Sequence, residues 1–175
     1  MSIVISGDGT MQQMASGGIT GGATLVAGTA VSTTSGTAIS FTGIPSWAKR
    51  ITILLNQVTT NTSAVLQVQV GSGSYSTTGY ASQYWLVGTY SGVTTSGFIL
   101  GGNVGYATGG IIVLSLIGAN TWVQSGALGF QNTSSTGYTS IGSSPALSGA
   151  LDRVQITTVA GTPTFASGTI NILYE

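Results

Sequence analysis

Only six residues of the 175 carry a charged side chain, and they are the groups that could perform acid–base or ionic chemistry: Asp8, Lys49, Arg50, Asp152, Arg153 and Glu175. The chain has no histidine and no cysteine, which removes imidazole bases and thiolate or imidazole metal ligands. Its three carboxylates are far apart in sequence, whereas a glycosidase needs two that converge. Three basic residues are also too few to hold a phosphate backbone. We therefore expect no enzyme, no cofactor, no metal site and no nucleic-acid partner.

One short motif resembles a catalytic element. Ser46 and Lys49 have the S-x-x-K spacing of acylating penicillin-binding enzymes. That chemistry needs the motif on a helix, together with S-D-N and K-T-G elements elsewhere in the chain. Here the motif follows Pro45 and precedes an apolar run, and neither companion is present. We interpret it as a turn.

The basic and acidic residues cluster at the starts of apolar segments. Lys49 and Arg50 precede one such segment, and Asp152 and Arg153 precede another. Charges there can act as gatekeepers that block edge-to-edge strand pairing. They can also join Glu175 in ion pairs between subunits. Because so few charges exist, we predict that these five residues form inter-subunit ion pairs.

Aromatic residues are concentrated between positions 75 and 106. The seven are Tyr75, Tyr80, Tyr84, Trp85, Tyr90, Phe98 and Tyr106. Tyrosine among serine and glycine is typical of adaptable recognition loops, since it offers contact area at a low entropic cost. Such a loop would stack on a sugar ring or dock on a protein. The alternative, which we favour, is that these side chains pack the loop onto the domain or line a subunit interface.

The segments that would position these residues are short and β-branched. Helix-period patterns are absent, and strands are predicted at 37–42, 50–58, 64–71, 111–117, 121–130 and 168–174. Residues 72–110 and 132–144 are predicted to be mainly loops, with short strands near 83–87 and 97–100. Residues 146–159 fit either two strands or one bent strand. The spacing predicts an all-β domain over 36–175, a β-sandwich and specifically a jelly roll.

Residues 1–35 differ in composition from the rest. They are glycine-rich with short apolar pieces, so we predict an N-terminal arm that anchors the protein to a neighbouring subunit or another partner. The alternative is a leader with one extra edge strand. No apolar run reaches the roughly 18 residues of a membrane span, and no basic signal-peptide region opens the chain. A formal net charge of zero is tolerable for a protein whose apolar faces are covered by copies of itself or by a larger particle.

Three phrases carry a family resemblance: FTGIPSWAKRIT at 41–52, TWVQSGALG at 121–129, and the tail from LDRVQITTV to GTINILYE at 151–175. They resemble small β-domains of tailed-bacteriophage virion surface proteins, including tail-fibre-like and head-decoration proteins. The resemblance implies a homotrimeric structural protein without an enzymatic site, made in the host cytoplasm and located on the virion. It would be a capsid decoration or cement protein or a short fibre. The alternative is a tail-fibre tip module that recognises host surface glycan.

Overall fold

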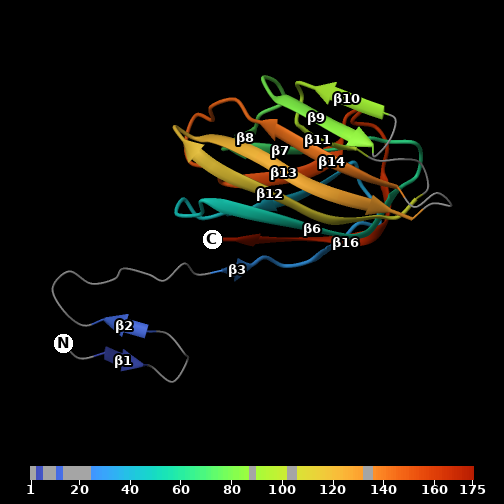
Figure 1. Cartoon of the computed structure of the whole chain (residues 1–175). Helices are drawn as coiled ribbons and strands as arrows, with labels where there is room; N and C mark the ends of the chain where they lie inside the picture. Colours follow the sequence, from blue (N-terminus) through green and yellow to red (C-terminus); the bar gives the residue numbers. More distant parts are fainter. Residues whose placement is uncertain (1–2, 6–10, 14–24, 87–89, 102–105, 132–135) are drawn as a thin grey trace.

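The computed structural model describes residues 3–5, 11–13, 25–86, 90–101, 106–131 and 136–175. Every regular element in these residues is a β-strand, and the strands of the main body form two antiparallel sheets that face each other (Figure 1). The predicted all-β sandwich is therefore confirmed, while the finer jelly-roll connectivity stays a prediction. No helix in the described ranges is long and apolar enough to cross a bilayer.

The large sheet has nine strands and lies in front in Figure 1. In spatial order it contains β10 (Tyr90–Thr94), β9 (Ala81–Leu86), β14 (Thr136–Ser143), β13 (Thr121–Phe130), β12 (Thr108–Gly118), β6 (Arg50–Thr60) and β16 (Phe165–Tyr174), followed by the short strands β3 (Val26–Ala27) and β4 (Val31–Ser32), which both pair with β16.

The small sheet lies behind it and has five strands. In spatial order it contains β11 (Phe98–Gly101), β7 (Leu66–Ser72), β15 (Arg153–Thr158) and β5 (Ala38–Thr42), and the two-residue β8 (Ser74–Tyr75) pairs with β7.

The core lies between the two sheets and follows the period-2 alternation of the strands. Ile112 and Leu114 of β12 and Ile53 of β6 are fully buried, and they meet Val68 and Val70 of β7. Burial of each such side chain stabilises the fold by about 1.5–3 kcal/mol. The inward face of each sheet is thus covered by this core.

The short strands predicted near 83–87 and 97–100 are confirmed as β9 and β11. The remaining loop prediction is wrong in part, because β8 and β10 also lie in the first segment, 72–110, and β14 occupies most of 132–144. Glycine, serine and tyrosine made both segments look irregular, but neighbouring strands supply the missing contacts. The ring of Tyr84, for example, lies against Gly92, its direct cross-strand partner. Conversely, only Arg153–Thr158 of the 146–159 segment is a strand.

Part of the predicted arm belongs to the sandwich. Strands β3 and β4 extend the large sheet along β16, and the hydroxyl of Thr33, which is fully buried, donates to the Ser167 carbonyl at 2.6 Å. Residues 25–35 therefore match the edge-strand alternative. Farther toward the N-terminus, β1 (Ile3–Ile5) and β2 (Met11–Gln13) pair with each other as a separate two-stranded sheet. Asp8 and residues 14–24 lie outside the described residues.

Candidate interaction surface

The first predicted ion pair forms within one chain. Arg50 Nη1 lies 3.0 Å from Glu175 Oε1, and the Glu175 carbonyl accepts the backbone N–H groups of Lys49 and Arg50. These contacts follow from the pairing of β16 with β6. Arg50 and Glu175 thus form an intrachain clamp at the end of β16, and a pairing of these charges between subunits stays a prediction.

The second pair is also intrachain. Arg153 Nε lies 2.7 Å from Asp152 Oδ1, and both carboxylate oxygens of Asp152 accept the Gly73 N–H at 3.1 Å. The hydrogen bond from Arg153 lowers the pKa of Asp152 from its ordinary 3.8, and the same contact raises the pKa of Arg153. The Arg153 guanidinium also lies 5.8 Å from the centroid of the Tyr75 ring, which fastens β8 beside β15.

Lys49 belongs to neither pair. Its Nζ donates to the Ser46 carbonyl at 3.3 Å, and the Ala48 N–H closes a turn onto the Pro45 carbonyl at 3.0 Å. The S-x-x-K residues thus lie in a turn before β6, as the sequence suggested.

Three of the seven aromatic residues belong to the interior. Phe98 is fully buried, and Tyr80 and Tyr84 are nearly so. The rings of Tyr80 and Phe98 meet edge to face at 5.0 Å. The Tyr80 hydroxyl accepts the Val70 N–H at 2.9 Å, and burial raises its pKa to about 12.

The other four aromatics have separate environments. Tyr75 lies under Arg153, and Tyr106 packs 6.2 Å from the ring of Phe130. The structure describes only the backbone of Tyr90, in β10. Among the side chains of this group that the structure describes, Trp85 alone projects into solvent, with 40% of its surface exposed. The segment is therefore a set of strands whose aromatics mostly pack inward, and it is not a continuous recognition loop.

The exposed apolar side chains gather elsewhere, on the solvent side of the large sheet, which we call the outer face. Eight large hydrophobic residues are exposed in the described chain, and five lie on this face: Trp85, Val93, Ile111, Ile117 and Ile141. Their sequence neighbours on the same strands, such as Ile112 and Ser140, are buried, so alternation directs the five outward.

Strand register aligns the outer face in rows across the sheet. One row runs through directly paired residues from β10 to β16: Val93, Gln83, Ile141, Ser125, Val113, Thr52 and Leu173. The next row runs Trp85, Thr139, Ala127, Ile111, Leu54 and Asn171. Neither row contains a charged residue. A third row holds Arg50, beside Ser115, and Glu175, which pairs with Arg50 across β6 and β16.

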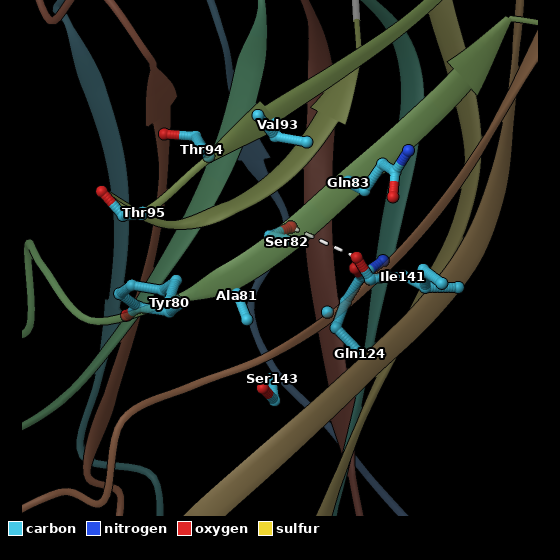
Figure 2. A pocket seen from close by; sticks show the side chains of 11 residues that line it. Tyr80, Ala81, Ser82, Gln83, Val93, Thr94, Thr95, Gln124, Ile141 and Ser143 are labelled. Atoms are coloured by element: carbon cyan, nitrogen blue, oxygen red, sulfur yellow. Dashed lines mark hydrogen bonds between the residues drawn. The ribbon is translucent and has the colours of Figure 1, made fainter.

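One half of the outer face is hollowed. A groove of about 920 Å³, open to solvent, lies over β9, β14 and the β10 end. Val93, Gln83 and Ile141 line it from neighbouring strands, with Thr94 and Ser143 at its margins (Figure 2). Gln124 also borders it, and the buried Oε1 atom of this side chain has no hydrogen-bond partner in the described structure. The lining is neutral, with apolar side chains among hydroxyls and amides.

The small sheet presents a different outer surface. Gln155 Nε2 donates to Gln69 Oε1 at 2.6 Å, and Gln69 Nε2 donates to the Ser96 carbonyl at 2.7 Å. The Gln67 amide continues the ladder to the Thr158 carbonyl at 3.3 Å. Gln67 and Gln69 are buried, so the polar groups of this side are satisfied by one another and by backbone carbonyls. An antiparallel sheet with a free side usually shows a polar face to water, and the apolar outer face of the large sheet departs from that rule.

Sequence reasoning missed the outer face. Its strongest signal was the segment from Ile111 to Ile117, which is apolar on both faces of the strand instead of alternating. Searches of protein-family models, curated proteins and solved structures find nothing that matches the chain. No cluster of three or more possible metal ligands occurs in the residues that are described.

Proposed function

We propose that the protein is a non-catalytic structural component of a bacteriophage virion surface, assembled as a homotrimer, in the role of a decoration or cement protein or a short fibre. The observation that carries this proposal is the outer face of the large sheet, where Ile111, Ile117 and Val93 are between 51% and 75% exposed and the rows of Ile111 and Val93 contain no charged residue. Apolar patches of this kind mark interaction surfaces.

The charge distribution supports the same role. Arg50, Glu175, Asp152 and Arg153 pair within the chain, so they bring little net field to the surface. A particle component gains from such neutrality because its contacts do not depend on ionic conditions. The sequence resemblance to virion surface domains supports the location, and the segment before Leu25 is the proposed attachment to other virion proteins.

Sedimentation equilibrium of the full chain at micromolar concentration tests the proposal. We expect a single species with three times the 17.5 kDa chain mass. A second arm locates the chain by mass spectrometry of purified phage particles and of particles treated to remove surface proteins. A stable monomer, or absence from the particles, would contradict the proposal.

Glycan recognition at a fibre tip is the second candidate, favoured by Trp85, which is exposed beside a neutral groove of hydroxyls and amides. Aromatic faces and neutral hydrogen-bonding groups suit uncharged sugars. Binding of the purified protein to a glycan array, lost in Trp85→Ala and retained in Trp47→Ala, would support it. Trp47 is the matched control because it is 49% exposed outside the outer face, beside Tyr174.

A further inference from the structure

We propose that the two halves of the outer face are mates between neighbouring copies of this chain: an apolar ridge on one copy sits in the groove of the next. The ridge is defined by Ile111, Val113 and Ile117 of β12 with Leu54 of β6 and Leu173 of β16. This inference rests on the proposed assembly and names its interface.

The relief of the face supports this pairing. The groove lies over β9, β10 and β14, whereas Ile111 and Ile117 stand 51% and 66% exposed on β12. Between these halves, β13 presents the small residues Ser125, Ala127 and Gly129. Two grooves placed against each other would enclose a void, and voids forfeit packing contacts. A ridge seated in a groove fills it.

The chemistry of the two halves also matches. Val93 and Ile141 in the groove are apolar, as are the ridge residues, and Gln83, Thr94 and Ser143 can bond to the polar neighbours of the ridge, such as Thr52 and Asn171. The two rows that carry most of the apolar side chains contain no ion, and Arg50 in the third row is already paired with Glu175 within the chain, so no unpaired charge would be buried.

The available area suits a closed ring. Seven strands at a spacing of about 4.8 Å, with three outward rows about 7 Å apart, project roughly 700 Å². Each ridge-in-groove contact uses about half of this projection from each copy, so the roughly 800 Å² of accessible surface that a stable interface uses per partner is approached only when each copy has both neighbours.

The proposed homotrimer fixes how the two halves are used. A two-fold dimer would seat both ridges in both grooves at once, whereas a head-to-tail contact uses one half per neighbour and forms a ring only when the rotation between copies closes. In the trimer each copy offers its ridge to one neighbour and its groove to the other.

The test uses two charge insertions in the full chain. Val93→Lys changes the groove and Ile111→Lys changes the ridge, while Val159→Lys adds the same charge at a site that is 40% exposed outside the outer face. Each lysine variant alone should weaken association by about tenfold or more, as burial of an unpaired charge requires, and Val159→Lys should leave it unchanged. Circular dichroism checks the fold. If a lysine variant does not fold, Val93→Thr and Ile111→Thr replace it because threonine keeps the strand preference.

Mixing the two variants decides the arrangement. The ridge of Val93→Lys and the groove of Ile111→Lys are both intact, so a one-to-one mixture should form a heterodimer that cannot close into a ring. Native mass spectrometry reads this directly. Failure to form the heterodimer, when each variant alone is dissociated, would overturn the ridge-in-groove contact. Wild-type association that neither variant changes would overturn the choice of face while leaving the proposed assembly standing, and a monomeric wild type would remove both.

Discussion

Tyr80 joins two layers of the structure through one hydroxyl. It accepts the Val70 N–H at 2.9 Å and donates to the Ser76 carbonyl at 3.1 Å, and its ring packs on Phe98. The backbone of β7 is thereby tied to the chain entering β9. Ionisation of a phenol in this buried place is unfavourable, which is why its pKa rises to about 12.

Tyr80 should make the protein sensitive to alkali. Its folded pKa of about 12 exceeds the ordinary 10.0, so its contribution is fully present below pH 10 and is lost as the pH rises through 12. The loss is on the order of 3 kcal/mol. Tyr80→Phe should show less alkaline loss, and should be less stable at pH 7 by about 1–3 kcal/mol because the Val70 N–H loses its acceptor. Urea unfolding from pH 7 to 12 measures both, with Tyr174→Phe as control. An unchanged alkaline loss in Tyr80→Phe would refute the assignment.

Asp152 should act at the opposite end of the pH scale. Its pKa in the folded protein is lowered by the hydrogen bond from Arg153, so its contribution is present above pH 3.8 and is lost as the pH falls through the lowered value. In Asp152→Asn the loss of stability between pH 5 and 2 should be smaller than in the wild type, while the midpoint at pH 7 falls slightly. Urea midpoints across this range provide the measurement. Equal acid sensitivity in the two proteins would show that other groups dominate.

At the scale of elements, a bulge shapes the middle of the large sheet. Gln57 has a positive φ of 53°, and the pairing of β6 with both β12 and β16 shifts register beside it. Gly168 lies opposite with a φ of +107°, and a Cβ there would meet the Gln57 carbonyl oxygen at 2.5 Å. The bulge therefore depends on glycine at position 168.

Gly168→Ala should destabilise the protein more than Gly43→Ala. Both glycines have positive φ, but a Cβ at Gly43 meets no atom within 4 Å. Gly43→Ala should cost about 1–2 kcal/mol through backbone conformation alone. Gly168→Ala should cost more because it adds the clash with the Gln57 backbone. Thermal and urea unfolding of the two variants compare the cost of the backbone conformation with the cost of the added clash. Equal losses of stability would mean that the bulge relaxes and removes the clash.

Sequence patterns predicted the elements that are determined by residues close together in the sequence. The hairpin at Gly118–Asn120 follows from turn chemistry, and Ala119 and Asn120 both take the positive φ of 46° and 56° that such tight turns need. The strand at 121–130 matches β13 residue for residue. Strands β10 and β14 were less visible because they are stabilised by residues far away in sequence, such as Gly101 of the small sheet, against which the Tyr138 ring of β14 packs.

The candidate surface was less predictable than the fold. Composition indicated that apolar faces need cover, but it could not show which sheet carries them. Val93 and Ile141 are far apart in sequence and become neighbours only because each pairs with Gln83. The intrachain ion pair was hidden for the same reason, since the pairing of β16 with β6 brings Glu175 to Arg50 within one chain.

At the scale of the whole molecule, the outer sides of the two sheets differ in chemistry. The small sheet carries a hydrogen-bonded glutamine ladder in which Gln67 and Gln69 are buried, and the large sheet turns outward a face with 40–75% exposed Trp85, Val93, Ile111, Ile117 and Ile141. With a formal net charge of zero, long-range repulsion does not keep copies apart. Solubility then depends on the large sheet being covered.

Association of the copies should accordingly respond to salts through the hydration of apolar surface and not through the screening of charges. Raising sodium chloride from about 0.05 to 0.5 M should change the dissociation constant by less than about threefold, because screening acts on charges that the face lacks. Sodium sulfate should tighten association and cooling should weaken it, as burial of apolar surface requires. Analytical ultracentrifugation across the two salts and from 5 to 35 °C makes the comparison, with melting temperatures that rise with protein concentration as an independent readout. A steep weakening in sodium chloride would mean that Lys49 or Arg50, and not the apolar rows, holds the copies together.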